Sequence, residues 1–367
     1  MYSVVAYAIW DYSPIFQKIY IIQAQHYYMA RIKDYKIATI GSHSALQILK
    51  GAKDEGFSTI AICIKGREKP YKLYNVADKI ITISDYSELM GLQSRLMKEK
   101  VIFIPHASLI EYVGLDNIEK FRVPYYGNKH ILRFESDRNI ERKWLKSSGL
   151  KVPRMFENAK DIDRAAIVKL HGAKGGKGYF LAKNEKDFKQ KIKAHTGEKD
   201  YVIQEYIVGV PMFIHYFYSP LNDELEVMGF DKRYESNVDS LGRISARDQI
   251  ALPKVDPSYV IVGNIPIVVR ESYLPRIIEM GENVIRESKK LTKGGLWGPF
   301  CLETIITPEG DIFVFEISAR IVAGTNPYVN GSPYTWLRYN EPMSTGKRIA
   351  REIKTAIKKK QLGRILG

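Results

Sequence analysis

The chain has 367 residues, of which 45% are hydrophobic and 26% are charged, a composition that excludes a wholly disordered chain and is typical of a globular enzyme with a large core. The net charge of +15 indicates attraction for anions, but it does not distinguish nucleic acids, membranes and phosphorylated substrates. The cysteines, Cys63 and Cys301, are far apart and form no metal-binding motif, so we expect a reducing cytoplasm and neither a disulfide framework nor a zinc site.

Residues 1–34 are expected to be an N-terminal extension without an assigned function. Residues 1–28 are rich in aromatic side chains, and with histidine neutral their only charges are Asp11 and Lys18. They lack the basic start of a signal peptide, and the two charges interrupt any membrane span. Two alternatives remain open: the segment is native, or Met29 is the natural start.

Residues 35–135 are predicted to form a doubly wound α/β domain with a parallel sheet. Short apolar runs alternate with amphipathic stretches, which is typical of consecutive βαβ units. The expected strands are 36–41, 57–65, 79–84 and 101–106, and the expected helices are 42–56 and 87–100. A charged helical stretch over 136–149 follows, and Gly149 and Pro153 mark a boundary.

The rest of the chain is predicted to be α+β, divided into residues 136–210 and 211–367. The expected elements are strands 165–170, 178–183 and 201–207, helix 185–195, and hairpins over 212–234 and 299–318. The last helix, within 346–367, places three isoleucines on one face. Its many basic residues are interpreted as a solvated face rather than a nucleic-acid surface, because no aromatic side chains alternate with them.

The stretch 169-KLHGAKGGKGYF-180 combines four glycines and three lysines with no acid. It is not a Walker A loop, because Lys177 is followed by Gly178 and a strand rather than by Ser or Thr and a helix. A glycine-rich hairpin between strands can close over a triphosphate and donate from backbone N–H groups and lysines. Lys169, on the preceding strand, is expected to contact a phosphate. The alternative is a flexible surface hairpin.

A second feature is the pair Glu303 and Glu316, one on each strand of the terminal hairpin. Both stand among apolar residues, so both are expected to be buried, and a buried carboxylate needs a cation partner. Opposing strands can bring the two carboxylates to one or two Mg²⁺ ions that bridge nucleotide phosphates. The alternative is a salt bridge to a lysine.

The segment 40-IGSHSALQ-47 places small polar residues between an expected strand and an expected helix. The N-terminus of such a helix favours an anion, with Ser42 or Ser44 as the capping side chain. His43 is placed to contact a phosphate or a base, and the alternative is a histidine without a ligand role. Ser108, in PHAS, follows another expected parallel strand and so lies at the same sheet edge, where ligands of open α/β sheets bind.

Together these features resemble the ATP-grasp superfamily, in which ATP lies between two α+β subdomains. A strand lysine, a glycine-rich hairpin, the segment QEYI and glutamates on a terminal hairpin carry the resemblance. It implies an ATP-grasp fold with an N-terminal pre-ATP-grasp domain. The residues that it implies bind ATP are Lys169, Lys174, Lys177, Gln204, Glu205, Tyr206 and Ile207.

The resemblance also implies a metal site, in which Glu303 and Glu316 bind Mg²⁺ or Mn²⁺. ATP-grasp enzymes commonly have Asn two residues after the second glutamate, whereas this chain has Ser318, so the ligands of a second metal remain open. Lys177 and Arg320 are implied to be catalytic, with Arg320 available to an anionic intermediate.

Ten sequence blocks between residues 41 and 334 narrow the resemblance to the archaeal 5-formaminoimidazole-4-carboxamide ribonucleotide synthetases. Among these blocks are GSHSALQILKGAKDEGFSTI, IPHASLIEYVGLDNI, HYFYSP, DKRYESNVD and FEISAR. The family is implied to use ATP and formate to formylate 5-aminoimidazole-4-carboxamide ribonucleotide (AICAR) in purine biosynthesis, through formyl phosphate. His43, Ser108 and Asn264 are then implied to contact AICAR, and Glu235 the ATP. By itself, Asn264 is typical of a turn before Pro266.

The same resemblance implies a cytoplasmic homo-oligomer that binds small molecules and neither nucleic acid nor membrane. Two other functions remain open. One is an ATP-grasp ligase for another acid or amine, and the other is a basic nucleic-acid-binding protein, supported only by the charge and the C-terminal lysines. No local signature favours a Ser-His-Asp triad or a cysteine nucleophile.

Overall fold

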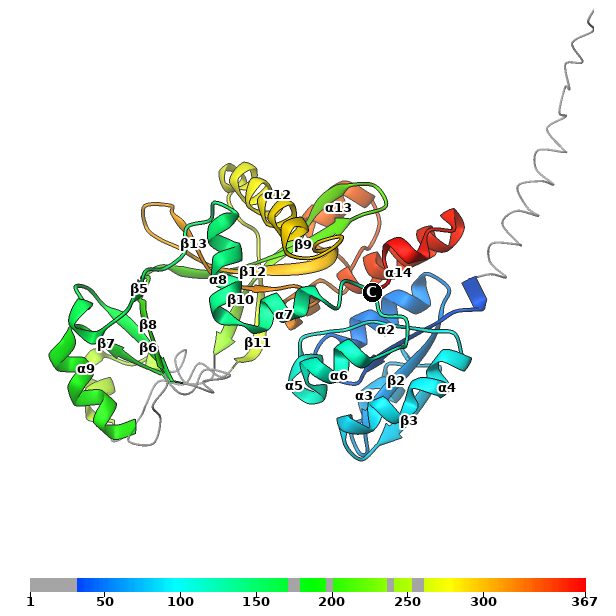
Figure 1. Ribbon diagram of the computed structural model, residues 1–367, viewed down its shortest axis with the longest axis horizontal. Coiled ribbons are helices and arrows are strands. Elements are labelled where there is room, and N and C mark those ends of the chain that lie inside the picture. The colour runs from blue at the N-terminus through cyan, green and yellow to red at the C-terminus, as the bar shows by residue number, and fades with distance from the viewer. Residues whose placement is uncertain (1–31, 171–178, 196–200, 236–240, 253–260) are drawn as a thin grey trace, which may run out of the picture.

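The computed structural model describes residues 32–170, 179–195, 201–235, 241–252 and 261–367. These residues form three sheets, of which the second, small sheet lies at one end of the molecule and the third spans its middle (Figure 1). Within these ranges, no helix is long and apolar enough to cross a membrane.

The first sheet is parallel with the strand order β3-β2-β1-β4, as predicted. Its strands are β1 (Lys36–Ile40), β2 (Ser58–Ile64), β3 (Lys79–Ile83) and β4 (Val101–Phe103). The helices of this part are α2 (Ala45–Asp54), α3 (Lys69–Leu73), α4 (Gln93–Lys98), α5 (Ser108–Val113) and α6 (Leu115–Lys120). The helix predicted over 87–100 is only α4, because Asp85 and Glu88 form a capping box that fixes a 3₁₀ turn before it.

The second sheet is antiparallel with the strand order β5-β8-β6-β7. Its elements are β5 (Met155–Phe156), β6 (Ala166–Leu170), β7 (Tyr179–Ala182), α9 (Glu185–Ile192) and β8 (Tyr201–Glu205). Lys169 pairs with Tyr179 across β6 and β7. This confirms that the glycine-rich stretch connects two antiparallel strands, although residues 171–178 lie outside the described ranges.

The central sheet is antiparallel with the strand order β11-β10-β9-β12-β13. Its strands are β9 (Val210–Ser219), β10 (Glu224–Glu235), β11 (Ile261–Ile267), β12 (Gly298–Ile306) and β13 (Ile312–Ser318), so both predicted hairpins are confirmed. The interpretation of Asn264 as a turn residue is wrong, because it lies within β11. Gly263 and Pro266 resemble turn signals, but β11 is an edge strand, where a proline is tolerated.

The remaining helices are α7 (Ile131–Ser136), α8 (Arg138–Ser147), α11 (Ala246–Ala251), α12 (Leu274–Leu291), α13 (Pro333–Tyr339) and α14 (Thr345–Lys359). Helices α8 and α12 pack together beside the central sheet (Figure 1). The indole Nε1 of Trp144 in α8 donates to the carbonyl oxygen of Val284 in α12 at 3.2 Å. This contact fixes α8, whose other side faces the site described below.

Helix α14 packs against α2, and the isoleucines on its predicted apolar face are buried. The expectation of a solvated basic face is wrong for part of this helix. Arg348 is buried and pairs with Glu226 and Glu352, each at 2.8 Å, and Arg351 pairs with Glu55, which follows α2. Glu226 and Glu55 come from distant segments, so the helix sequence alone reveals only the partner within the helix, Glu352.

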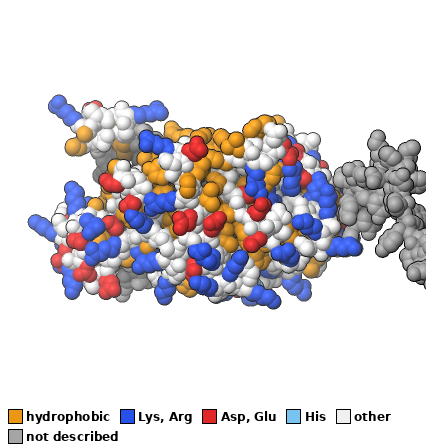
Figure 2. Space-filling model, turned by 90° about the horizontal axis from the view of Figure 1, so that it is seen from above, with side chains coloured by type: hydrophobic (Ala, Val, Ile, Leu, Met, Phe, Trp, Pro, Cys, Tyr) orange, Lys and Arg blue, Asp and Glu red, His pale blue; other side chains and the backbone are white. Residues whose placement is uncertain are grey.

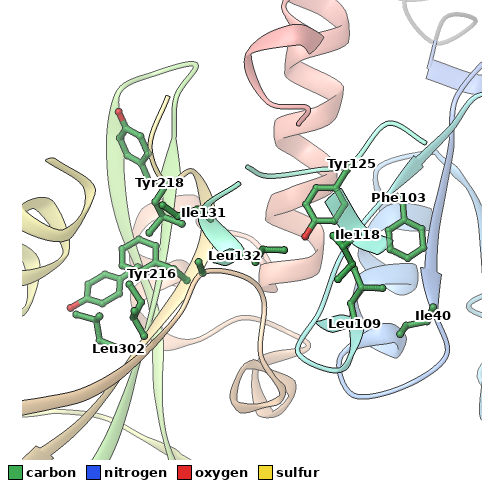
Figure 3. Packing of buried hydrophobic residues seen from close by; sticks show 14 of the residues in the cluster. Ile40, Phe103, Leu109, Ile118, Tyr125, Ile131, Leu132, Tyr216, Tyr218 and Leu302 are labelled. Carbon is green, nitrogen blue, oxygen red and sulfur yellow. The ribbon is translucent and has the colours of Figure 1, made fainter. Parts of the chain in front are cut away.

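One hydrophobic core joins the first sheet to the central sheet. In Figure 3, Ile40 and Phe103 of the first sheet lie on one side, Tyr216 and Leu302 of the central sheet on the other, and Leu132 of α7 between them. All five are buried in the same cluster. Because a close-packed core resists deformation, the two sheets hold the side chains at their junction in a fixed arrangement.

Candidate active site

The candidate site lies where one face of the central sheet meets the carboxyl edge of the first sheet. A β-bridge joins His106, after β4, to Ile321, after β13. The side-chain nitrogen of Asn326 donates to the carbonyl oxygen of His43, after β1, at 3.1 Å. Segments that follow strands of both sheets therefore meet here.

The central sheet contributes polar side chains from all five of its strands. The register places Glu303 of β12 opposite Glu316 of β13, and Arg233 of β10 opposite Asn264 of β11. Residues directly opposite one another in a ladder share one face of the sheet. The contacts described below add two more to this face, so it carries His215, Asp231, Arg233, Asn264, Glu303 and Glu316.

The two glutamates predicted as metal ligands lie opposite each other, but their surroundings differ. The side chain of Glu303 is 14% exposed and lies 3.4 Å from the guanidinium of Arg233. Glu316 is exposed, so the expectation that both are buried is wrong for it, because the end of β13 borders a cavity. Burial and the charge of Glu316 raise the pKa of Glu303 to about 8. The salt bridge considered as an alternative exists at Glu303, with an arginine instead of a lysine.

The glutamate pair fits a divalent cation that also binds nucleotide phosphates. Mg²⁺ in such sites is held by one or two carboxylates and completes its shell with phosphate oxygens and water. Burial, followed by the charge of Glu316, raises the pKa of Glu303, and a cation between the two carboxylates would relieve the second of these effects. Among the described side chains there is no cluster of three or more His, Cys, Asp or Glu that could hold a metal.

A cavity of about 490 Å³ opens beside Glu316, between the second sheet and the central sheet. Its wall includes Lys169 of β6, Gln204 of β8 and Arg320, which follows β13. Helices α7 and α8 add the carboxylates of Glu135 and Glu141. The volume is within the range of small-molecule and cofactor sites. The strand lysine and one predicted metal ligand therefore share one cavity.

The side chain of Lys169 lies among the acids of this cavity, with its Nζ 6.0 Å from the ring centroid of Phe315. Burial lowers the pKa of Lys169, and the charge of Glu316 opposes this effect. A partly desolvated ammonium interacts strongly with a phosphate, because little water must be displaced. Three other predicted contacts lie outside the described side chains and stay predictions: Lys174, Lys177 and Glu235.

Of the four consecutive residues 204–207 that are predicted to bind ATP, only the first lines the cavity. Gln204 is buried and lines it. Glu205 pairs with Arg164 at 3.0 Å, Tyr206 is exposed and Ile207 is half-buried. The structure brings Gln204 to the cavity, and the nucleotide contacts of Glu205, Tyr206 and Ile207 stay predictions.

His43 and Ser108 meet at the carboxyl ends of β1 and β4. These are adjacent parallel strands, so the loops that follow them lie side by side. Nδ1 of His43 lies 3.0 Å from the hydroxyl of Ser42 and also contacts the hydroxyl of Ser108. Burial, followed by the charges of Arg320 and Arg233, lowers the pKa of His43. A neutral ring whose Nδ1 accepts from serine carries its proton on Nε2 and donates from that side.

The capping role predicted for Ser42 or Ser44 is wrong. Ser44 occupies the N-cap position of α2, but its buried hydroxyl has no hydrogen-bond partner among the described residues. The hydroxyl of Ser42 contacts His43 instead. The unpaired hydroxyl and the free N–H groups at the start of α2 leave donors for an anion.

Arg320 lies between the cavity and the loop of His43. It lines the cavity, and its charge contributes to the lowered pKa of His43. Its guanidinium pairs with Glu135 of α7 at 2.6 Å. Glu135 and Glu141 also accept from backbone N–H groups at the end of β13, at 2.9 and 2.6 Å. Helices α7 and α8 thus hold the segment that carries Glu316 and Arg320.

The chain is similar to known synthetases along most of its length. A 5-formaminoimidazole-4-carboxamide-1-(beta)-D-ribofuranosyl 5′-monophosphate synthetase from Pyrococcus abyssi is 53% identical over 339 residues, which are 90% of this chain and 98% of the relative. The synthetase of the same name from Methanocaldococcus jannaschii is 48% identical and matches 90% of this chain and 94% of the relative. The chain belongs to this synthetase family.

Family models and solved structures agree with this membership. Residues 37–156 match a protein of unknown function, DUF1246, and residues 180–367 match a domain of unknown function, DUF1297. An IMP biosynthesis protein, PurP, from Thermococcus kodakaraensis has a TM-score of 0.71 at 28% identity, and the match covers 90% of this chain and 100% of that chain. N5-carboxyaminoimidazole synthetase from Staphylococcus aureus, complexed with ADP, has a TM-score of 0.62 at 16% identity over 87% and 77%. The predicted ATP-grasp fold is confirmed.

Several polar residues of this synthetase's site are not singled out by the sequence analysis: His106, Glu135, Glu141, His215, Asp231 and Arg233. The available signal was a polar side chain inside an apolar strand. His215 stands within MFIHYFY and Asp231 within MGFDKRY, both at positions that a core disfavours unless the group is paired. The two glutamates of the helices gave no such signal, because a charged helix is typical of a surface.

His106 supports the two predicted AICAR contacts. It is fully buried, its Nε2 donates to the carbonyl oxygen of Ile40 at 2.9 Å, and its Nδ1 accepts from the backbone N–H of Ser108 at 3.3 Å. Its ring stacks on that of His43 with centroids 5.9 Å apart. Burial, followed by the charges of His43 and Arg320, lowers the pKa of His106 to about 3, although the bond to Ile40 opposes this.

His106→Gln is expected to make the protein less sensitive to acid. The unfolded chain binds a proton at this histidine below about pH 6.5, whereas the folded protein does so only near pH 3. Between these values, the free energy of unfolding falls as the pH falls, by about 1.4 kcal/mol per pH unit from this group. Urea unfolding at pH 7 and pH 5 should show that the wild type loses about 2 kcal/mol more than the variant. Replacement of the exposed His130 by Gln is the control, and an equal loss in all three proteins would contradict the prediction.

Proposed function

We propose that this chain is a ligase that uses ATP and formate to formylate the 5-amino group of AICAR and releases ADP and phosphate. The position of Arg320 carries the proposal. It lines the cavity that contains Lys169 and Glu316, and it lies close enough to His43 to affect its pKa. ATP in the cavity and a ribonucleotide at His43 would therefore meet at one cation. The names of the relatives from Pyrococcus abyssi and Methanocaldococcus jannaschii support the same reaction.

In the first step, a carboxylate oxygen of formate attacks the γ-phosphorus of ATP. The bond from this phosphorus to the β–γ bridging oxygen breaks, which releases ADP and leaves formyl phosphate. Lys169 and Arg320 stabilise the negative charge on the transferred group and its leaving oxygen. Glu303 and Glu316 hold Mg²⁺ or Mn²⁺, which neutralises phosphate charge when bound.

In the second step, the 5-amino nitrogen of AICAR attacks the formyl carbon. The bond from that carbon to the phosphate oxygen breaks, and the phosphate leaves with the proton that the nitrogen loses. An aromatic amine is a weak nucleophile, so most of the acceleration must come from positioning and from stabilisation of the developing oxyanion. Arg320 lies between the proposed positions of the two nucleotides, and it serves this second role.

The AICAR site is proposed to extend from α2 to β11. The 5′-phosphate binds at the start of α2, where the hydroxyl of Ser44 has no partner among the described residues. His43 donates from Nε2, and Ser108 holds its ring in place. Asn264 contacts the base from the central sheet. These contacts keep the reacting amine on the side of Arg320.

Product analysis tests this function directly. The purified protein is incubated with Mg-ATP, AICAR and ¹³C-formate, and the products are separated by liquid chromatography and mass spectrometry. We expect one labelled formyl group per ADP released, and no product when any one substrate is omitted. ATP cleavage that depends on a different acid, with no labelled AICAR product, would favour the alternative of another ATP-grasp ligase.

His43→Ala is expected to weaken the use of AICAR much more than the use of ATP. Loss of a hydrogen bond to a charged group typically costs about 10- to 100-fold in affinity, so KM for AICAR should rise by about that factor while KM for ATP stays within about twofold. Steady-state kinetics with each substrate varied separately measures the change in KM for AICAR and the change in KM for ATP. The exposed His130→Ala is the control. A larger change for ATP than for AICAR would show that His43 is assigned to the wrong substrate.

The nucleic-acid alternative has less support in the structure than in the sequence. Several cations of α14 pair with acids of other elements, among them Arg348, Arg351 and Lys354. On the face drawn in Figure 2, basic side chains are interspersed with acidic and hydrophobic ones. Thermal unfolding with RNA, compared with Mg-ATP and AICAR, separates the two classes, because the ligase is stabilised only by the small nucleotides. The prediction that the protein is a homo-oligomer remains a prediction. Light scattering, which measures the molar mass in solution, tests it.

A further inference from the structure

Asp231 is fully buried beside the proposed AICAR site and is surrounded by donors. Nε2 of His215 lies 2.7 Å from its Oδ1, Nδ2 of Asn264 lies 2.6 Å from its Oδ2, and Nε of Arg233 lies 3.5 Å from Oδ2. The backbone also closes over the group, since a Cβ at Gly324 would lie only 2.2 Å from Oδ1. A carboxylate that accepts two hydrogen bonds beside a guanidinium stays ionised and can only accept.

This carboxylate determines how Asn264 presents its amide. Because Asp231 only accepts, the NH₂ group of Asn264 must face it, and the amide oxygen Oδ1 faces the other way. Asn264 is half-exposed, so a bound ligand can reach that oxygen. The segment that covers Asp231 at Gly324 also reaches the other half of the site, since the side-chain nitrogen of Asn326 donates to the carbonyl oxygen of His43 at 3.1 Å. A ligand atom that binds Oδ1 of Asn264 must therefore be a hydrogen-bond donor.

We propose that Asp231 is a positioning residue that makes the site select the 4-carboxamide of AICAR, by holding Oδ1 of Asn264 toward the carboxamide N–H. The inference rests on the proposed function. The reacting 5-amino group must lie toward Glu303 and Arg320, and β12 is three strands from β11, about 14 Å at the usual strand spacing. Of the two substituents on the imidazole base, the 4-carboxamide is then the one that can face Asn264. A ribonucleotide with a 4-carboxylate has no N–H there and would place its charge against an acceptor.

Asp231→Asn should reverse this selection. Nδ1 of His215 is buried without a partner among the described residues, so moving the ring proton to Nδ1 would bury an unpaired N–H. Nε2 of His215 therefore keeps its proton, and the new amide turns its oxygen to His215 and its NH₂ to Asn264. Asn264 must then turn over and offer NH₂ to the ligand, which favours a carboxylate. The double substitution Asp231→Asn with Asn264→Asp preserves the two hydrogen bonds and again offers an acceptor.

Calorimetric titration with AICAR and with the 4-carboxylate ribonucleotide, in the presence of a non-hydrolysable ATP analogue and Mg²⁺, measures the selection. The wild type should prefer AICAR. Asp231→Asn should weaken AICAR binding about 10- to 100-fold and reverse the ratio of the two Kd values, and the double variant should restore the preference. Binding of the ATP analogue alone should not change, whereas a merely structural loss would affect it as well.

An unchanged ratio in Asp231→Asn would overturn the inference. If that variant does not fold, as judged by thermal unfolding, Asn264→Leu decides instead, because this position is half-exposed on an edge strand. Its two Kd values should become similar, and a retained preference for AICAR would equally overturn the inference. A wild type that binds neither ribonucleotide would refute the proposed function. If the wild type binds AICAR but the variants keep its preference, only the inference about Asp231 fails.

Discussion

Glu316→Gln is expected to reduce formate-dependent ATP cleavage by about 10²- to 10³-fold, the loss typical when one charge-stabilising group is removed from an active site. Glu316 borders the cavity, lies opposite Glu303 in the β12–β13 ladder, and lies close enough to Lys169 to affect its pKa. Glutamine keeps the size of the side chain and removes the charge that attracts a divalent cation. Because Glu316 is exposed, the substitution leaves the core intact.

The loss should be specific to catalysis and to the metal. ADP release measures the rate, and electron paramagnetic resonance of Mn²⁺ in the presence of ATP measures metal binding, which should weaken in parallel. Glu309→Gln, in the exposed turn of the same hairpin, is the matched control and should behave as the wild type. If Glu316→Gln cleaves ATP at the normal rate, the metal site is misassigned.

The elements that the sequence predicts well are those with a strong local pattern. The parallel strands of the first sheet are continuous apolar runs, and the two long hairpins reverse at polar turns, so both follow from short windows. Strand β11 has neither property, because it lies at an edge, is partly exposed and contains Gly263 and Pro266. Its existence depends on pairing with β10, which is a contact between distant segments.

The residues of the candidate site also fall into those that a local sequence pattern predicts and those that it does not. His43, Ser108, Glu303 and Glu316 follow from their places at strand ends or on a hairpin, and the structure brings each pair together. The residues that connect the pairs could not be predicted, since their roles depend on packing between distant segments. Glu135 lies just before the predicted charged helical stretch and carries no signal in the sequence, yet its side chain is only 6% exposed and holds both Arg320 and the end of β13. Buried polar groups of this kind show their partners only in three dimensions.

Arg320→Met is expected to lower the rate of AICAR formylation by about 10²- to 10³-fold, because it removes the cation between the two nucleotide sites. The single substitution would also leave the carboxylate of Glu135 without its partner, and an unpaired buried charge destabilises the fold. The informative variant is therefore Arg320→Met combined with Glu135→Gln. The glutamine oxygen can still accept from the backbone at the end of β13.

Two measurements on the double variant separate catalysis from structure. Glu135→Gln alone keeps the guanidinium and should retain most of the activity, so the difference between the two proteins isolates Arg320. The pKa of His43, measured by NMR, should rise in the double variant, because burial still lowers it but the largest nearby positive charge is gone. An unchanged pKa would show that Arg320 does not act on the AICAR loop. A normal rate of formylation would remove Arg320 from the mechanism, and with it the observation that joins the two halves of the site.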